Sequence, residues 1–439
     1  MNNRPSAGPA STFNRAGITL FLIQLAIALT FFRRGIYADQ FDFVPILEAV
    51  TKGDNWIHLV FLPHGDHWHT GAYILMLMTA HVTNWSLLPE ALTILLISLT
   101  GWFIIQNLAK SSFEESKQLS IVFPITFAFL YFLPSNAANF LWTWQISTYL
   151  VILGLVTMLF GLSKVAKHSS YFLLAVIGAG LGTISFATGF VLWPVGLVVL
   201  VFYSNTQGVR RLLLALIWLA VAAAFTFAFV HFRSSAFSAG ITIEPILNLK
   251  FLAIYLGATL AIFSRDLGIV LGFGGISLFL FLLIVVTRQS DNHNSKTLIL
   301  AVGLGLFGIF SGILISLGRL GLDLDMARSS RYMIFSSMFW IAVSILLYRY
   351  SFMDATRLFT PRLRKVSASG ILVIVLSFSA YSSQRISRGE IELARGFNET
   401  LRSYVEDTDR STDFFLYPNS ERLESYLTYL ETRDLNLFR

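Results

Sequence analysis

The chain has 439 residues, of which 55% are hydrophobic and only 13% are charged, about half of the ~25% charged residues found in soluble domains. The net charge of +7 lies in short loops and forms no basic stripe with interleaved aromatic residues, so no nucleic-acid partner is expected. Cysteine is absent, which excludes disulfides and thiol chemistry. The many long charge-free runs exclude a soluble enzyme and predict an all-α membrane protein.

The apolar runs predict a polytopic transmembrane helix bundle. Runs such as 18–32 approach the ~20 residues that a helix needs to cross ~30 Å of hydrocarbon. We expect about eleven spans. In chain order they are residues 17–33, 89–108, 119–135, 145–163, 171–187, 190–204, 210–231, 268–287, 297–317, 332–348 and 367–383.

Two further apolar segments, 70–86 and 246–263, are ambiguous. If both cross the membrane, the basic loops around Lys164 and Arg210 lie opposite the basic N-terminus; if neither crosses, these loops share its side. Cytoplasmic loops carry an excess of Lys and Arg, which favours the second arrangement. We therefore expect two interfacial or re-entrant helices, a cytoplasmic N-terminus and an extracytoplasmic C-terminus.

This arrangement predicts a transmembrane domain over residues 1–383 and a small extracytoplasmic helical tail over 384–439. The first outer loop of the transmembrane domain, called loop one below, covers residues 33–89. The tail has an ordinary density of charged residues. Its pattern predicts two short amphipathic helices, at 388–406 and 419–432, joined by a turn near Tyr417-Pro418 and packed on the outer face of the membrane domain.

Loop one begins with two carboxylates, Asp39 and Asp42, a few residues beyond the first span. They are three residues apart, so they share one face if Asp39 opens a helix. A carboxylate held at the membrane surface is a candidate general base, which makes both residues candidate catalytic groups. The alternative is that Asp39 merely caps a short helix.

Loop one continues with a polar cluster that contains His64, Asp66, His67 and His69. Imidazole and carboxylate groups bind zinc or manganese, but this spacing is not a standard zinc pattern. A divalent metal is therefore the least favoured interpretation of this cluster. The sequence assigns no definite cofactor. Direct contact with a substrate phosphate or sugar hydroxyl is favoured, and a simple polar interfacial loop is the remaining alternative.

A late outer loop, 318–331, places three arginines on the side of the membrane that basic residues normally avoid. Arg319, Arg328 and Arg331 are candidate ligands of a phosphate, because guanidinium forks match phosphate oxygens in a bidentate way. Tyr332, which begins the next span, is a candidate contact beside them. The alternative is that the arginines pair with Asp323 and Asp325 or with lipid headgroups.

With these elements placed, the chain resembles the GT-C superfamily of polytopic membrane glycosyltransferases. The resemblance rests on Asp39-x-x-Asp42 after the first span, on the two apparent interfacial helices, and on the late loop with Arg328 and Arg331. It implies a GT-C-like fold and transfer of sugar, with an inverting mechanism expected, from a polyprenyl-phosphate donor on the outer face of the membrane. The acceptor would be a cell-envelope glycan or glycolipid, and the location a bacterial inner membrane.

More closely, the chain is similar to a bacterial group of membrane proteins that carry an acidic loop-one motif. Those proteins also carry a His-Asn-Glu-His-Arg stretch, a Ser-Arg-Tyr sequence entering a late span, and a tail with Leu-Tyr-Pro. The corresponding stretches here are 64–68, 330–332 and 416–418. Asp66 replaces the glutamate and Trp68 stands where the arginine would be, which puts any role of that arginine in doubt.

Three other classes of function compete with a glycosyltransferase. A transporter or flippase of lipid-linked saccharides would place ionisable residues deep within its spans, whereas here they gather at the outer edge. A polymerase or ligase of cell-surface polysaccharide would carry a larger late outer loop than 318–331. A non-catalytic assembly partner would not depend on Asp39.

Overall fold

We describe the chain from a computed structural model. The structure describes residues 9–109, 122–232, 240–289, 296–351, 360–407, 417 and 419–438. The regular elements in these ranges are helices, which confirms the predicted all-α class. Pro418 of the predicted tail turn and Leu416 of the Leu-Tyr-Pro stretch lie outside the described residues.

Within the described ranges, eight helices are long and apolar enough to cross a membrane. They are α1 (Pro9–Phe31), α5 (Leu87–Ala109), α8 (Ile146–Lys164), α11 (Gly208–Phe232), α13 (Arg265–Gln289), α14 (Lys296–Arg319), α15 (Met333–Ser351) and α16 (Pro361–Asp407). The other three predicted spans form shorter elements, namely α6 (Val122–Tyr131), α9 (Ser170–Thr183) and the run of η5, α10 (Leu192–Val198) and η6 over 187–203. The chain is thus a multi-pass membrane protein, and the count of eleven spans stays a prediction.

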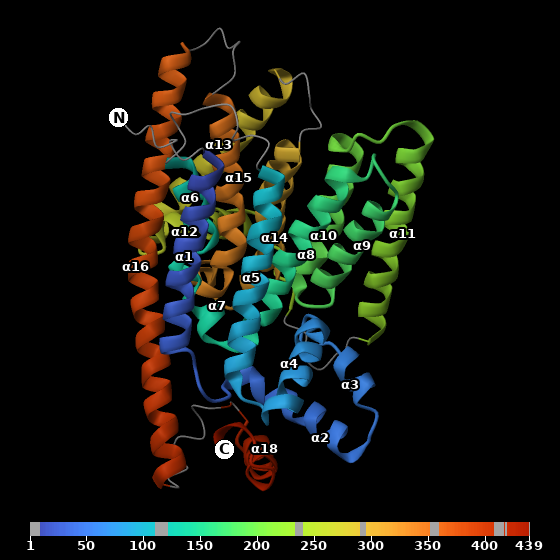
Figure 1. Ribbon diagram of the computed structural model, residues 1–439, viewed down its shortest axis with the longest axis vertical. Helices are drawn as coiled ribbons and strands as arrows, with labels where there is room; N and C mark the ends of the chain where they lie inside the picture. The colour runs from blue at the N-terminus through green and yellow to red at the C-terminus, as the bar shows by residue number, and fades with distance from the viewer. Residues whose placement is uncertain are drawn as a thin grey trace, which may run out of the picture.

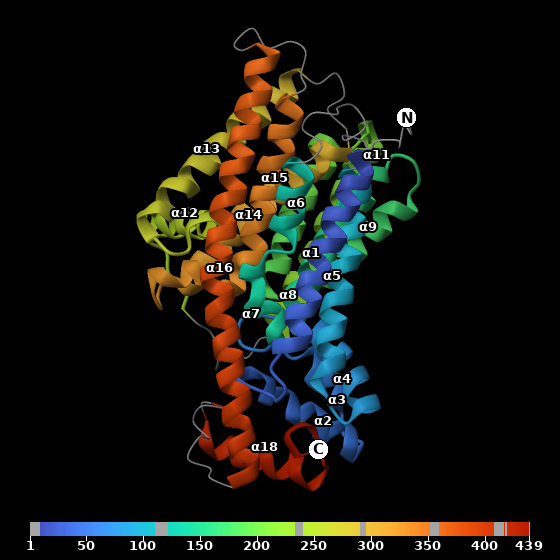
Figure 2. The same ribbon diagram turned by 60° about the vertical axis from the view of Figure 1, so that its left-hand side comes forward.

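The helices stand side by side in a bundle, and the helices of loop one and of the tail lie at the same end of it (Figures 1 and 2). We call this the loop-one end. Loop one forms η1 (Ala38–Phe43), α2 (Val44–Lys52), α3 (Trp56–Phe61) and α4 (Thr70–Thr83). The tail contributes α18 (Ser420–Thr432) and η11 (Asn436–Phe438).

The two ambiguous apolar segments form α4 and α12 (Pro245–Ala261). With 14 residues, α4 is about 21 Å long, shorter than the ~30 Å of the hydrocarbon layer. The side chains of α12 are buried from Phe251 to Ala261. Just outside its two ends, Thr242 N–H donates to the Leu317 carbonyl (2.9 Å) and Arg328 donates to the Ile262 carbonyl (3.0 Å). Both ends of α12 therefore lie beside the connection between α14 and α15, as expected of a segment that does not cross the bundle.

The tail differs from its prediction in one respect, because its first helix is not separate from the last span. Helix α16 runs unbroken for 47 residues, or about 70 Å, more than twice the thickness of the hydrocarbon layer. The sequence contains no proline between Pro361 and Pro418, and an isolated glycine only weakens a helix. The apolar span thus continues directly into the charged segment, whose end projects past the bundle at the loop-one end (Figure 1).

Loop one and the tail share a hydrophobic core of their own. Leu423, Leu427 and Leu430, spaced along one face of α18, are fully buried. They belong to the same cluster as Phe41 and Phe43 of loop one. Two segments from opposite ends of the sequence are thereby fixed against each other, because neither buries its apolar face alone.

Helices α8 and α9 approach each other through small residues. A Cβ atom added to Gly178 would lie 2.7 Å from the Gly154 carbonyl oxygen, and one added to Gly154 would lie 2.5 Å from the Gly178 carbonyl oxygen. Small residues at both faces bring the two backbones into contact, which is a common way to join helices in a membrane.

We therefore predict that Gly178→Leu lowers the melting temperature of the purified protein in detergent. The cost should exceed the ~1–3 kcal/mol of an overpacked core, because the clash is with backbone. The matched control is Gly274→Leu on α13, where no atom outside the neighbouring residues and the local helix backbone lies within 4 Å of an added Cβ. Equal melting temperatures for the two variants would show that the α8–α9 contact does not limit stability.

Candidate active site

A cavity of about 210 Å³ at the loop-one end brings together most of the residues that the sequence singled out. We call it the central chamber. Its lining comprises Asp39, His64, Gly65, Asp66, His67, Trp144, Gln145, Thr148, Phe186, Arg319, Arg331 and Tyr332. Loop one thus supplies carboxylates and imidazoles to the chamber, and the late loop supplies two guanidiniums.

Asp39 is carried on a tightly held turn. The residue before it, Ala38, has a φ of +49°, a left-handed conformation that costs about 1 kcal/mol or more for a residue with a Cβ. The start of η1 is capped by Gln40, whose side-chain oxygen accepts the Tyr37 N–H at 3.1 Å. Asp39 is therefore not the cap of this helix, and its side chain lines the chamber instead.

A buried chain of hydrogen bonds fixes Gln40, and with it the turn. The Gln40 amide donates to the Thr143 hydroxyl (2.9 Å), which donates to the Glu90 carboxylate (2.7 Å). The indole of Trp85 donates to the other oxygen of Glu90 at 3.0 Å. Since Gln40 and Glu90 are fully buried, each lost bond would leave an unpaired polar group in the core.

The histidine cluster forms a tight turn. The His64 N–H donates to the His67 carbonyl (2.8 Å) and the His67 N–H to the His64 carbonyl (3.2 Å). Gly65 within the turn has a φ of +57°, which glycine adopts without strain. The Trp68 indole donates to the Phe61 carbonyl at 2.9 Å, so Trp68 anchors the turn to α3.

Two of the histidines are coupled. The Nε2 atoms of His67 and His69 are 3.1 Å apart, so one ring donates a hydrogen bond to the other. Burial, then His64, and then Arg319 and Arg331 lower the pKa of His67 to about 3. Burial also lowers the pKa of His69 well below its usual range, with His67 and His64 acting in the same direction. Both rings are thus neutral at physiological pH.

Among the described residues, no three His, Cys, Asp or Glu side chains are placed to hold one metal ion. His69 is 1% exposed and is not part of the chamber lining.

The three arginines of the late loop have different surroundings. Arg319 ends α14 and Arg331 lies in η9 (Ser330–Tyr332), and both line the chamber. In the described part of the chain, neither has a carboxylate partner within ion-pair distance. Arg328 instead donates to the Ile262 carbonyl and pairs with Asp325 at 2.9 Å, so the ion-pairing alternative describes Arg328.

Backbone and neighbouring contacts hold Arg331 in place. The side-chain amide of Asn139 donates to the Arg331 carbonyl at 3.2 Å. The Ser330 hydroxyl donates to Glu390 of α16 at 2.6 Å. The Ser-Arg-Tyr sequence is thus tied to two other elements, which presents a preorganised guanidinium to the chamber.

The chamber adjoins two further cavities. The first, of about 200 Å³, is the apolar groove, which shares Asp66, His67, Phe186, Arg319 and Tyr332 with the chamber. Its remaining lining is Ala187, Thr188, Ile241, Leu314, Ile315, Leu317 and Gly318. The second, of about 670 Å³, is the tail cleft between loop one and α18, which shares Asp39, His64 and Gly65 with the chamber.

Asp42 lies in the tail cleft and is not part of the chamber lining. One carboxylate oxygen accepts the Tyr417 hydroxyl at 2.6 Å, and the other lies 3.8 Å from Nδ1 of His64. Burial raises the pKa of Asp42, while the hydrogen bond from Tyr417 and the neighbouring His64 oppose this rise.

Of the ten candidate residues, seven line the chamber: Asp39, His64, Asp66, His67, Arg319, Arg331 and Tyr332. Other residues that line the chamber or the tail cleft do not appear among these candidates, namely Trp144, Gln145, Phe186, Arg422 and Tyr426. The amphipathic pattern of 419–432 is the signal that could have indicated the last two, because residues four apart on a helix share a face.

Asp42 should make the stability of the protein depend on pH. Because folding raises its pKa above the ordinary 3.8, the folded state binds this proton more tightly than the unfolded state. Stability is therefore lost as the pH rises through that raised pKa. Asp42→Asn is neutral and still accepts the Tyr417 hydroxyl, so the melting temperature of this variant should rise relative to that of wild type as the pH increases above about 4.

Tyr417→Phe serves as the second variant in this series. It removes the hydrogen bond that lowers the pKa of Asp42, so its pH-dependent loss of stability should extend to higher pH than that of wild type. A difference between Asp42→Asn and wild type that stays constant with pH would contradict this account.

No family model, no curated protein and no solved structure matches this chain.

Proposed function

We propose that this protein is a membrane glycosyltransferase of GT-C type, which moves a sugar from a polyprenyl-phosphate donor to a cell-envelope acceptor on the outer face of a bacterial inner membrane. The observation that carries the proposal is one chamber lined by both the Asp39 carboxylate and the Arg319 and Arg331 guanidiniums. Transfer of a sugar from a lipid phosphate requires a base on one side of the anomeric carbon and positive charge on the other.

In this proposal, the Asp39 carboxylate takes the proton of the acceptor hydroxyl. The hydroxyl oxygen then forms a bond to the anomeric carbon while the bond from that carbon to the phosphate oxygen breaks. The leaving lipid phosphate takes the electron pair, and Arg319 and Arg331 stabilise the charge that develops on it. A single displacement of this kind inverts the anomeric centre.

The two neighbouring cavities fit a transfer in which the donor lipid lies on one side of the chamber and the acceptor on the other. The apolar groove meets the chamber beside Arg319 and carries Ile315 and Leu317 of α14, a spanning helix. It suits the first isoprene units of a lipid whose phosphate lies in the chamber. The tail cleft meets the chamber beside Asp39, where an acceptor hydroxyl has to arrive.

The first test is transfer from a panel of radiolabelled polyprenyl-phosphate sugars by the purified protein and by Asp39→Asn. Loss of a general base should lower the rate about 10²- to 10⁴-fold. Asp54→Asn is the matched control, because Asp54 is an exposed carboxylate of loop one that lines neither the chamber, the apolar groove nor the tail cleft. Equal rates for wild type and a folded Asp39→Asn protein would remove Asp39 from the mechanism.

A second test separates charge from fork geometry at the phosphate. Arg331→Gln should lower the turnover rate about 10²- to 10³-fold, the usual effect of removing one donor to a developing oxyanion. Arg331→Lys should restore part of it, because lysine keeps the charge but lacks the planar pair of donors. Arg34→Gln, at an exposed residue of the same end, is the control. Full activity of Arg331→Gln would place the phosphate elsewhere.

A further inference from the structure

The tail cleft is larger than the chamber and the apolar groove, and its walls come from both ends of the chain. One wall belongs to loop one and the start of α4, with Asp39, Asp42, Pro45, Ile46, Leu59, Leu62, Pro63, His64, Gly65 and Tyr73. The other belongs to the tail, with Tyr417, Asn419, Arg422 and Tyr426. At about 670 Å³ the cleft has the size of a site for a small organic ligand.

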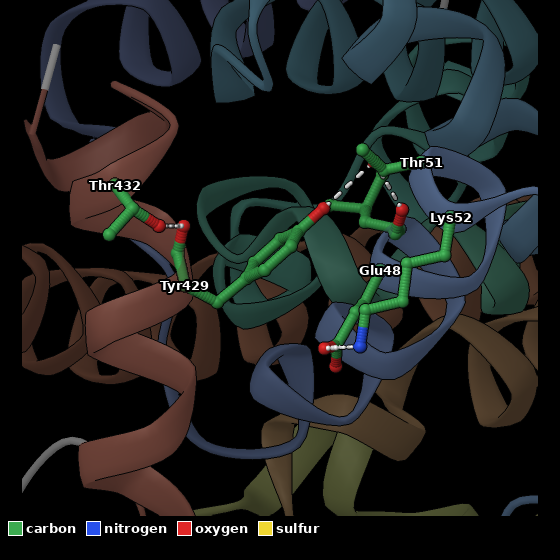
Figure 3. A network of polar contacts seen from close by, with 6 residues as sticks. Glu48, Thr51, Lys52, Tyr429 and Thr432 are labelled. Carbon is green, nitrogen blue, oxygen red and sulfur yellow. Dashed lines mark hydrogen bonds and ion pairs between the residues drawn. The ribbon is translucent and has the colours of Figure 1, made fainter.

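The tail wall is fixed rather than loosely apposed. The Asn419 side chain caps α18 by accepting the Arg422 N–H at 3.0 Å. The buried leucines of α18 anchor the helix in the core that it shares with loop one. Beyond the cleft, Tyr429 of α18 and Thr51 of α2 are joined by a hydrogen bond of 3.0 Å, beside the Glu48–Lys52 ion pair (Figure 3).

The chemistry of the walls favours an uncharged, hydroxyl-rich ligand. The lining holds two carboxylates, Asp39 and Asp42, against one guanidinium, that of Arg422, so an anionic ligand would meet an excess of negative charge. Carboxylates accept hydrogen bonds from hydroxyl groups. The rings of Tyr417 and Tyr426 lie 5.9 Å apart, tilted by 58°, and offer apolar faces with polar edges.

The cleft also opens onto the candidate base. Asp39 and His64 line both the tail cleft and the chamber, so a ligand in the cleft reaches the carboxylate without crossing a protein wall. Tyr417 holds Asp42 at the wall of the tail cleft through their hydrogen bond. Asp39 is therefore the carboxylate that lines both the tail cleft and the chamber.

We propose that the tail cleft is the acceptor site and that it takes an uncharged oligosaccharide, with Tyr426 and Arg422 of α18 as recognition residues. This inference rests on the proposed transferase function and adds the class of acceptor to it. The C-terminal segment is then part of the specificity of the enzyme, because two of the residues that touch the acceptor lie on its last long helix.

The test is binding of trisaccharides to the purified full-length protein by isothermal titration calorimetry, without a donor. The probes are uncharged trisaccharides of hexose and of N-acetylhexosamine units, and a trigalacturonate of the same length. At least one uncharged probe should bind, with an affinity at least tenfold above that of the trigalacturonate. Binding of the charged probe alone, or of none of the probes, would overturn the inference.

Two tyrosines on the same helix provide matched variants. Tyr426→Ala should weaken binding of the uncharged probe at least tenfold, because its ring lines the cleft. Tyr429→Ala removes an equal side chain one turn further along α18, where it lines a different cavity and supports the helix through its bond to Thr51, so it should weaken binding clearly less than Tyr426→Ala does. Equal losses in both variants, with both folded, would show that α18 acts only as a support.

The same variants separate this inference from the proposed function. Binding of a trisaccharide that depends on Tyr426, together with no transfer from any donor, would keep the cleft as a saccharide site and overturn the transferase. Transfer by wild type that is unchanged in Tyr426→Ala at limiting acceptor would keep the transferase and overturn the cleft as its acceptor site.

Discussion

The arrangement of the candidate site depends on the burial of one carboxylate, that of Glu90 at the start of α5. A carboxylate taken out of water has to be surrounded by donors, and here the donors come from Trp85 and Thr143. Thr143 in turn accepts a hydrogen bond from Gln40, which caps the turn that carries Asp39. The need to surround the Glu90 carboxylate with hydrogen-bond donors therefore connects the start of α5 to the position of Asp39, the candidate base.

Hydrogen bonds also join the two ends of the chain. The side chain of Asn436, three residues before the last, accepts the Ile36 N–H at 3.1 Å and donates to the Trp85 carbonyl at 2.8 Å. Asn84 and Trp85 both have positive φ values, so this turn needs outside bonds to hold it. The tail thus braces both loop one and the turn whose tryptophan solvates Glu90, and α16 provides the long connection that brings it there.

The charges at the loop-one end are divided between two sides of the chamber. Loop one brings the carboxylates and the neutral His67, and the late loop brings the guanidiniums. Since Arg319 and Arg331 lack carboxylate partners among the described residues, their charge remains directed at the chamber. This division, with the apolar groove on one side and the tail cleft on the other, is the basis of the proposed group transfer from a lipid phosphate.

The sequence by itself determined the helical membrane class, because long apolar runs have only one stable form in a bilayer. It also indicated Asp39, His64, His67, Arg319 and Arg331, since charged and imidazole groups gathered at one edge of a membrane domain need a reason to be there. It favoured Arg331 at the start of a span but kept Arg328 as a second phosphate ligand, because an ion pair with Asp325 and exposure to a cavity have the same local sequence pattern.

Only the tertiary structure decided that the last span and the tail form one helix, and that Tyr426 and Arg422 face loop one across a cleft. Hydrophobic periodicity reports which face of a helix is buried but not which distant segment buries it. The partners of Glu90 were equally invisible, since the bond from Thr143 spans 53 residues. Contacts of that range follow from how the bundle closes, which no local pattern encodes.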